Sequence, residues 1–177
     1  MHALPFVLLV GVALPGQAPA PPLQVRAEAA RADLFARLSG RLQEVMKAQG
    51  PAAAMEVCHA EAPALARAVG EAHGVRIGRT SWKLRNPGNA APAWAQAAVA
   101  VRRGEPLLQS TPEGGLQALF PIRLAEGCLR CHGEAATLPP DVRQALRTHY
   151  PADQATGFKA GDLRGWFWVE VPAGARP

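Results

Sequence analysis

Five consecutive residues, Cys128-Leu129-Arg130-Cys131-His132, constrain this chain more than any other feature. The spacing C-x-x-C-H is the pattern of c-type haem attachment. In that chemistry each thiol adds across one haem vinyl group to form a thioether, and the adjacent histidine lies under the iron. The motif therefore predicts one covalently bound haem c, attached at Cys128 and Cys131, with His132 as the proximal iron ligand.

A C-x-x-C pair also occurs as half of a zinc site or as a redox disulfide. Zinc would need two further ligands, and Cys58 with His59 or His149 are available. A thioredoxin-like pair should open a helix after a strand, whereas this pair lies in segment 127–138, which its composition predicts to be a loop. The histidine directly after the second cysteine favours haem over both alternatives.

Residues 1–20 have the organisation of a secretory signal peptide, with a truncated anchor or a misassigned start as alternatives. An apolar run from Leu4 to Leu14 is too short to span a bilayer comfortably, and small residues follow it up to Ala20. Haem attachment of this kind takes place outside the cytoplasm, so the leader agrees with the cysteine motif. We therefore expect an exported, periplasmic bacterial protein whose mature part, 21–177, is one domain without stable membrane insertion.

Composition excludes two other classes of protein. Hydrophobic residues make up 49% and charged residues 19% of the 177 residues, which is typical of a globular domain and not of a disordered chain. The formal net charge of +5 is spread along the chain without a dense basic block. Two haem propionates would offset part of it, so we expect no binding of nucleic acid.

Apolar residues recurring every three or four positions predict an amphipathic helix over 24–48 and a second helical stretch from Pro51 to Val69. Pro63 lies inside the second stretch. Because proline has no N–H, the carbonyl of His59 loses its helical partner there, and a kink or break is expected.

Strands are expected over 75–83, 117–124 and 164–171, and short helices over 92–103 and 141–149. The proline inside the second of these strands indicates a sheet edge or a bulge. Helices gather near the start of the chain and strands toward its end. This order predicts an α+β fold in which helices flank an antiparallel sheet.

Cys58 is left over once haem takes the other two cysteines, and a spare thiol in an exported protein calls for an explanation. It falls on the inward stripe of the second helical stretch, where a free cysteine often acts as a small buried hydrophobe. The alternative is that it binds iron opposite His132. Spacing alone does not decide between Cys58 and the other candidate ligands: Met46, Met55, His59, His73 and His149.

The basic segment 76–85 has two interpretations, a solvated face or a partner for haem propionates. Arg79 is the candidate propionate contact because Thr80 and Ser81, which are further donors, follow it. Tyr150, the only tyrosine, is a second candidate, or it simply closes a helix.

Several segments resemble, in one order along the chain, the bacterial single-haem PAS-like domains long catalogued as a domain of unknown function. The segments are Glu56-Val57-Cys58, Gly78-Arg79-Thr80-Ser81, Leu84-Arg85-Asn86-Pro87, the cysteine motif with Gly133, Tyr150-Pro151, Ala155-Thr156-Gly157-Phe158 and Gly161-Asp162-Leu163-Arg164-Gly165. The resemblance implies a PAS-like antiparallel sheet with N-terminal helices. It also implies haem ligated by His132 and by a helix cysteine that maps onto Cys58. Phe158 departs from the tyrosine of the family.

Two functions follow from a haem with histidine and thiolate ligands. The first is a redox- or gas-responsive sensor module, in which NO or CO replaces Cys58. The alternative is a periplasmic electron-transfer cytochrome whose ligands stay in place. Neither requires catalysis, and the sequence supplies no distal acid–base set, so we expect no enzyme activity. The expected partner is a redox or signalling protein of unknown identity.

Overall fold

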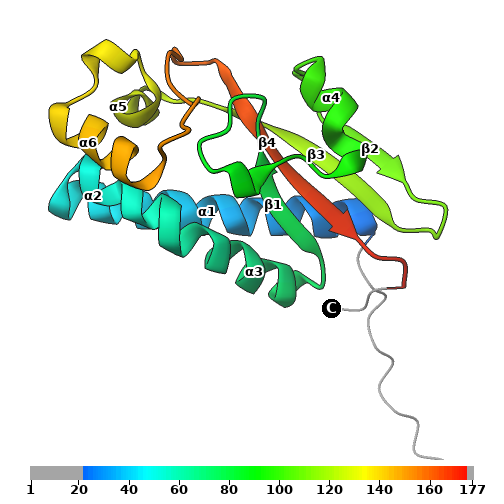
Figure 1. Ribbon diagram of the computed structural model, residues 1–177. Coiled ribbons are helices and arrows are strands. Elements are labelled where there is room, and N and C mark those ends of the chain that lie inside the picture. Colours follow the sequence, from blue (N-terminus) through cyan, green and yellow to red (C-terminus); the bar gives the residue numbers. More distant parts are fainter. Residues whose placement is uncertain (1–21, 175–177) are drawn as a thin grey trace, which may run out of the picture.

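The computed structural model describes residues 22–174, and its longest element is helix α1 (Leu23–Gln49) (Figure 1). Ala27, Ala30, Leu34 and Leu38 are buried along one face at spacings of three and four. The helix predicted over 24–48 is therefore confirmed. The predicted signal peptide, 1–20, lies outside the described residues.

The second helical stretch is divided as the internal proline requires. It consists of α2 (Pro51–Glu56), a π-helical turn η1 (Val57–Glu61) and α3 (Ala62–His73). Pro63 occupies the first turn of α3, where a missing N–H costs nothing. The expected distortion thus takes the form of one wide turn, and Cys58 lies on it.

Four antiparallel strands form one sheet in the order β1-β4-β3-β2. They are β1 (Arg76–Thr80), β2 (Leu107–Ser110), β3 (Leu116–Arg123) and β4 (Leu163–Val171). The predicted α+β fold, an antiparallel sheet with N-terminal helices, is confirmed. The sequence analysis did not find β2, which is four residues long and half exposed.

Pro121 lies in β3 beyond the part that pairs with β2, which reaches only Leu119. It therefore has a strand neighbour only on the β4 side, opposite Trp166, and a register shift follows between Ile122 and Arg123. The expectation of an edge or a bulge is confirmed in this local sense.

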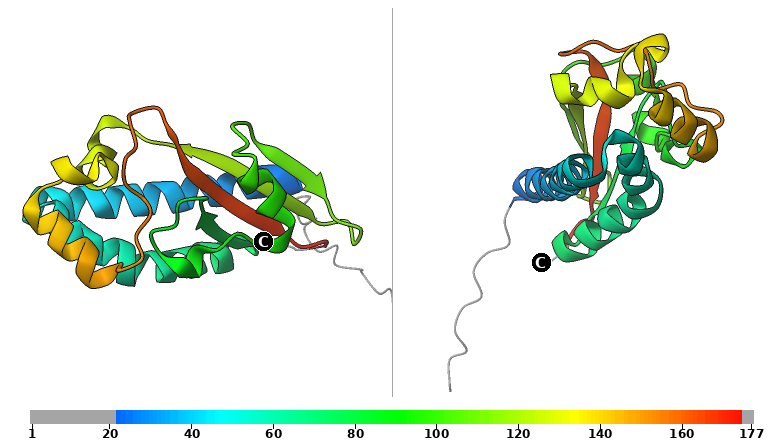
Figure 2. Two further views of the ribbon diagram at one scale, coloured as in Figure 1. Left: turned by 45° about the horizontal axis from the view of Figure 1, so that its top comes forward. Right: turned by 90° about the vertical axis from the view of Figure 1, so that its left-hand side faces the viewer.

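Helices cover the two faces of the sheet unequally (Figure 2). On one face α1 and α3 lie on β1, β3 and β4 and bury Phe120, Phe167 and Val169. On the other face the short η3 (Ala93–Ala95) and α4 (Gln96–Ala100) cover Leu119 and Trp166. The helix predicted over 92–103 is real but shorter.

Helical turns gather at the end of the sheet where β4 begins (Figure 1). They are the turns η4 (Glu126–Cys128) and η5 (Ala135–Thr137) and the helices α5 (Leu129–His132) and α6 (Pro140–His149). The loop predicted over 127–138 is therefore wrong, because Gly133 donates to the Leu129 carbonyl and closes a helical turn. In the described part of the chain no helix has the length and apolar character to cross a membrane.

Candidate functional site

A cavity of about 380 Å³ opens between α1, the π-helical turn and the start of β4. This volume lies in the range of small-molecule and cofactor sites. The structure brings all the predicted site residues to its wall: Cys58, Arg79, Cys128, Cys131, His132 and Tyr150. They come from segments as far apart in the sequence as Cys58 and Tyr150, so the fold itself assembles the site.

His132 is fixed by a backbone hydrogen bond, since its Nδ1 lies 2.7 Å from the carbonyl oxygen of Ala155. A carbonyl only accepts, so Nδ1 carries the proton and Nε2 keeps a lone pair. Burial holds the pKa of His132 well below its ordinary value, and the cations Arg85 and Arg164 lower it further. The ring is therefore neutral and oriented, as a metal-ligating histidine must be.

Arg85 is a residue whose role the sequence analysis did not single out. Its guanidinium pairs with Asp153 through Nε–Oδ1 and Nη2–Oδ2 contacts of 3.1 and 3.2 Å, and both side chains are buried. It also donates to the carbonyls of Cys131 at 2.6 Å and Ala155 at 3.2 Å. Arg85 thus ties the cysteine helix to the segment that orients His132.

Positive charge exceeds negative charge around the cavity. Arg79, Arg85 and Arg164 all line it, and Arg85 is already paired with Asp153. Burial, followed by repulsion from Arg85 and Arg79, lowers the pKa of Arg164 to about 10. The hydroxyl of Thr80 is buried at the wall and has no hydrogen-bond partner within residues 22–174. Donors of this kind fit a ligand that carries carboxylates.

Cys58 lies half-buried against the cluster Met55, Leu146 and Tyr150, and Cys131 touches the same cluster. Burial raises the pKa of the Cys131 thiol to about 11, so that thiol stays protonated at neutral pH. Burial also raises the pKa of Tyr150, with the thiol of Cys58 as the next cause. The π-helical turn therefore places a third sulfur beside the motif.

The other candidate ligands divide into two groups. Met46 and Met55 line the cavity. The three histidines do not: His59 stacks near His149, with ring centroids 5.1 Å apart, and His73 contacts Asp33 at 3.1 Å. Among residues 22–174, the candidate distal ligands at the cavity wall are therefore sulfur-containing residues, and His132 is the only histidine there.

An apolar wall on α1 completes the cavity. Leu38, Leu42 and Met46 belong to it, together with Phe35, whose ring meets Phe167 edge-on at 6.5 Å. Phe35 is nevertheless 53% exposed, which is unusual for a large aromatic residue.

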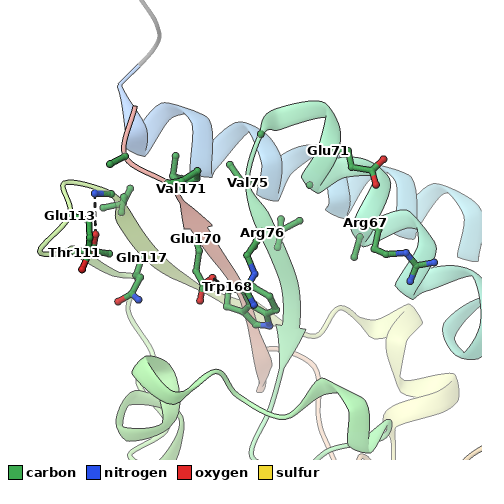
Figure 3. Close-up of a pocket in the computed structure, with 18 residues that line it drawn as sticks. Arg67, Glu71, Val75, Arg76, Thr111, Glu113, Gln117, Trp168, Glu170 and Val171 are labelled. Carbon is green, nitrogen blue, oxygen red and sulfur yellow. Dashed lines mark hydrogen bonds and ion pairs between the residues drawn. The ribbon is translucent and has the colours of Figure 1, made fainter. Parts of the chain in front are cut away.

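A second hollow, of about 930 Å³, lies at the opposite end of the sheet, beside β1 and β4 (Figure 3). Arg76 contacts Glu170 at 2.7 Å, and Glu170 also accepts a hydrogen bond from Trp94. The groove is also lined by Arg67, Glu71 and Glu113. Trp168 forms part of its floor (Figure 3). Two arginines and three glutamates thus line this groove, so it has no excess of positive charge, in contrast to the cavity at the cysteine motif.

The zinc alternative finds no support in the geometry. Within residues 22–174 no group of three or more histidine, cysteine, aspartate or glutamate side chains is arranged to hold a metal ion. Cys58 and Cys131 share a cavity wall, but His59 and His149 lie away from it.

The fold and the cavity together define a class of protein: an α+β cofactor-binding domain with its site at one end of an antiparallel sheet. The Tll0287-like family model matches residues 23–172, and the chain belongs to this family. A solved structure, described as the cyanobacterial heme-protein Tll0287, is 25% identical with a TM-score of 0.65. The match covers 89% of this chain and 100% of that one. No curated protein matches the chain.

Proposed function

We propose that this chain is an exported c-type haem protein that acts as a redox- or gas-responsive module. One observation carries the proposal: Cys58, Cys128, Cys131 and His132 line a single cavity that also holds buried, unbalanced cations. Membership of a family that includes a cyanobacterial haem-protein supports the same cofactor. When bound, haem supplies a one-electron iron centre that also takes diatomic ligands.

Cys128 and Cys131 would hold the cofactor covalently. Each Sγ–H adds across one vinyl C=C, so that one C–S and one C–H bond form and no atom is lost. Cys128 caps α5 and Cys131 is its third residue, so the two sulfurs are carried by one turn of backbone. Arg85 holds that turn through the carbonyl of Cys131.

The polar wall of the cavity would bind the propionates. Arg79 offers a charged donor, and among the described residues the buried Thr80 hydroxyl has no hydrogen-bond partner. Tyr150 is a further donor, with its raised pKa keeping the phenol protonated. Arg85 is paired with Asp153, so it would contribute positive charge to the cavity rather than a free hydrogen-bond donor.

Cys58 would be the distal ligand and the responsive part of the site. A thiolate places negative charge on the iron, which favours the ferric state and lowers the reduction potential. Cys58 would be the ligand that leaves on reduction, and NO or CO would bind in its place. Cys58 lies on the π-helical turn, a form of helix that occurs frequently at functional sites.

A change at Cys58 has a route to the rest of the molecule. Glu61, the last residue of the π-helical turn, pairs with Arg41 of α1 through contacts of 2.8 and 3.0 Å. Movement of the turn would therefore reach the helix that covers the sheet. A redox or signalling protein that binds this surface would respond to the movement.

Redox-dependent absorption and EPR on wild type and Cys58→Ala, with and without NO or CO, test the proposal. We expect a low-spin ferric wild type, a changed spectrum in the variant, and gas binding only after reduction. His59→Ala is the matched control, since His59 is the neighbouring residue but lies outside the cavity. An unchanged low-spin spectrum in Cys58→Ala would remove Cys58 from the iron.

The same experiment decides between the two functions. A reduced wild type that keeps Cys58 and refuses both gases would instead select the electron-transfer cytochrome. Export is tested separately: a chain expressed with residues 1–20 should be recovered from the periplasm and a chain without them from the cytoplasm.

A further inference from the structure

Arg164, near the start of β4, lies directly against the histidine of the cysteine motif. Its Nε is 3.4 Å from Nδ1 of His132. The guanidinium is held on two other sides, because Nη1 donates to the carbonyl of Lys83 at 3.1 Å and the group sits 5.6 Å from the Phe158 ring centroid. Its position beside His132 is therefore fixed.

The contact between Arg164 and His132 is not a hydrogen bond. Nδ1 of His132 already donates to the Ala155 carbonyl at 2.7 Å, so two N–H groups face each other across the 3.4 Å. The remaining interaction is electrostatic: the positive charge of Arg164 acts on the imidazole ring of His132. This charge opposes the effect of the Ala155 hydrogen bond, which makes a ligating histidine a better electron donor.

No ion pair neutralises Arg164 among residues 22–174. The nearby acid, Asp153, is bound by Arg85 through both of its oxygens. Arg164 is only partly exposed, and the guanidinium of an arginine carries its positive charge at neutral pH. A buried charge acts over short distances with little screening.

We infer that Arg164 raises the reduction potential of the site and so counteracts the lowering of that potential by the thiolate of Cys58. The inference rests on the proposed function. Ferric iron carries one more positive charge than ferrous iron, so a fixed cation behind the proximal ligand destabilises the ferric state more. Contacts to a ligating histidine and burial of the site both change the reduction potential of a haem. Arg164 is thus a positioning and charge-setting residue that leaves the iron ligands unchanged.

Spectroelectrochemical titration of the purified haem protein tests this role. In Arg164→Met and Arg164→Gln we expect the ferric-to-ferrous ratio at a fixed potential to rise about tenfold, which corresponds to a midpoint lowered by about 59 mV for one electron. Arg164→Lys, which keeps the charge, should recover most of the wild-type value. Arg123→Met is the matched control, because Arg123 is an exposed cation on β3 of the same sheet.

Haem content and the ferric spectrum are measured first on every variant. A wild type without haem bands would overturn the proposed function and this inference with it. A wild type and Arg164→Gln that both carry full haem with the same low-spin spectrum and equal potentials would overturn the inference alone. A raised potential in Arg164→Gln would do the same.

Discussion

The two ends of the sheet differ in the balance between positive and negative side chains. At the groove shown in Figure 3, Arg76 and Glu170 pair at the surface, where Arg76 is 77% exposed. At the cysteine end, Arg79, Arg85 and Arg164 line one cavity, and among residues 22–174 an ion pair is formed by Arg85 alone of the three, with Asp153. The groove has no excess of positive charge, whereas the cavity has an excess of cations that fits an anionic ligand.

The largest expected effect concerns the covalent bonds at the cysteine end. Cys128→Ser with Cys131→Ser should remove all haem that survives denaturation, because both thioethers are lost. Haem staining after a denaturing gel measures this. Cys58→Ser is the control and should keep the stain, since Cys58 is not part of the attachment motif. Covalent haem in the double variant would mean that the sulfur assignment is wrong.

A large effect is also expected from breaking the buried ion pair between Arg85, which lines the cavity, and Asp153. Arg85→Met leaves Asp153 as an uncompensated buried carboxylate, which typically costs about 3 to 5 kcal/mol. Thermal or urea unfolding measures the loss. The double variant Arg85→Met with Asp153→Leu should recover much of it, because neither charge is then left alone. A stable single variant would contradict the structural role assigned to Arg85.

The corresponding change in the groove should be small. Arg76→Gln removes a surface ion pair, for which about 1 kcal/mol or less is expected. The same unfolding measurement applies, with haem content as a second readout that should not change. A loss of unfolding free energy as large as that of Arg85→Met would contradict the proposed difference between the surface ion pair of the groove and the buried ion pair at the cavity.

The smallest effect is a pH dependence of the contact between α1 and α3. Hydrogen bonds from Arg37 and His73 hold the pKa of Asp33 below its usual value of 3.8. Because the pKa is depressed in the folded state, the stabilisation is present above pH 3.8 and is lost as pH falls through the folded pKa. Acid unfolding of Asp33→Asn should therefore show a weaker slope in that window. An identical slope in wild type and variant would contradict this assignment.

Much of the molecule was predictable because its signals are local. The motif at Cys128 to His132, the periodicity over 24–48 and the interruption at Pro63 each lie within a few consecutive residues. The distortion at Cys58 followed from the missing N–H of Pro63, although the form it takes, a π-helical turn, depends on packing against α1 and α6.

The rest depends on contacts between distant residues. Arg85 acquires its role from Asp153, sixty-eight positions away, and Arg164 from His132, thirty-two positions away. In the sequence both look like ordinary surface cations. The strand β2 was missed because four half-exposed residues carry too little pattern. The helical turns at the cysteines were missed because short segments rich in glycine and small residues resemble loops.

Intact mass spectrometry with a pyridine haemochrome spectrum, on the chain exported from cells that attach c-type haem, tests the central claim most directly. The account predicts a denatured chain heavier by the mass of one haem, with the bands of a haem attached through two thioethers. A chain at its apoprotein mass, without haem absorption and with all three cysteines open to alkylation, would contradict it.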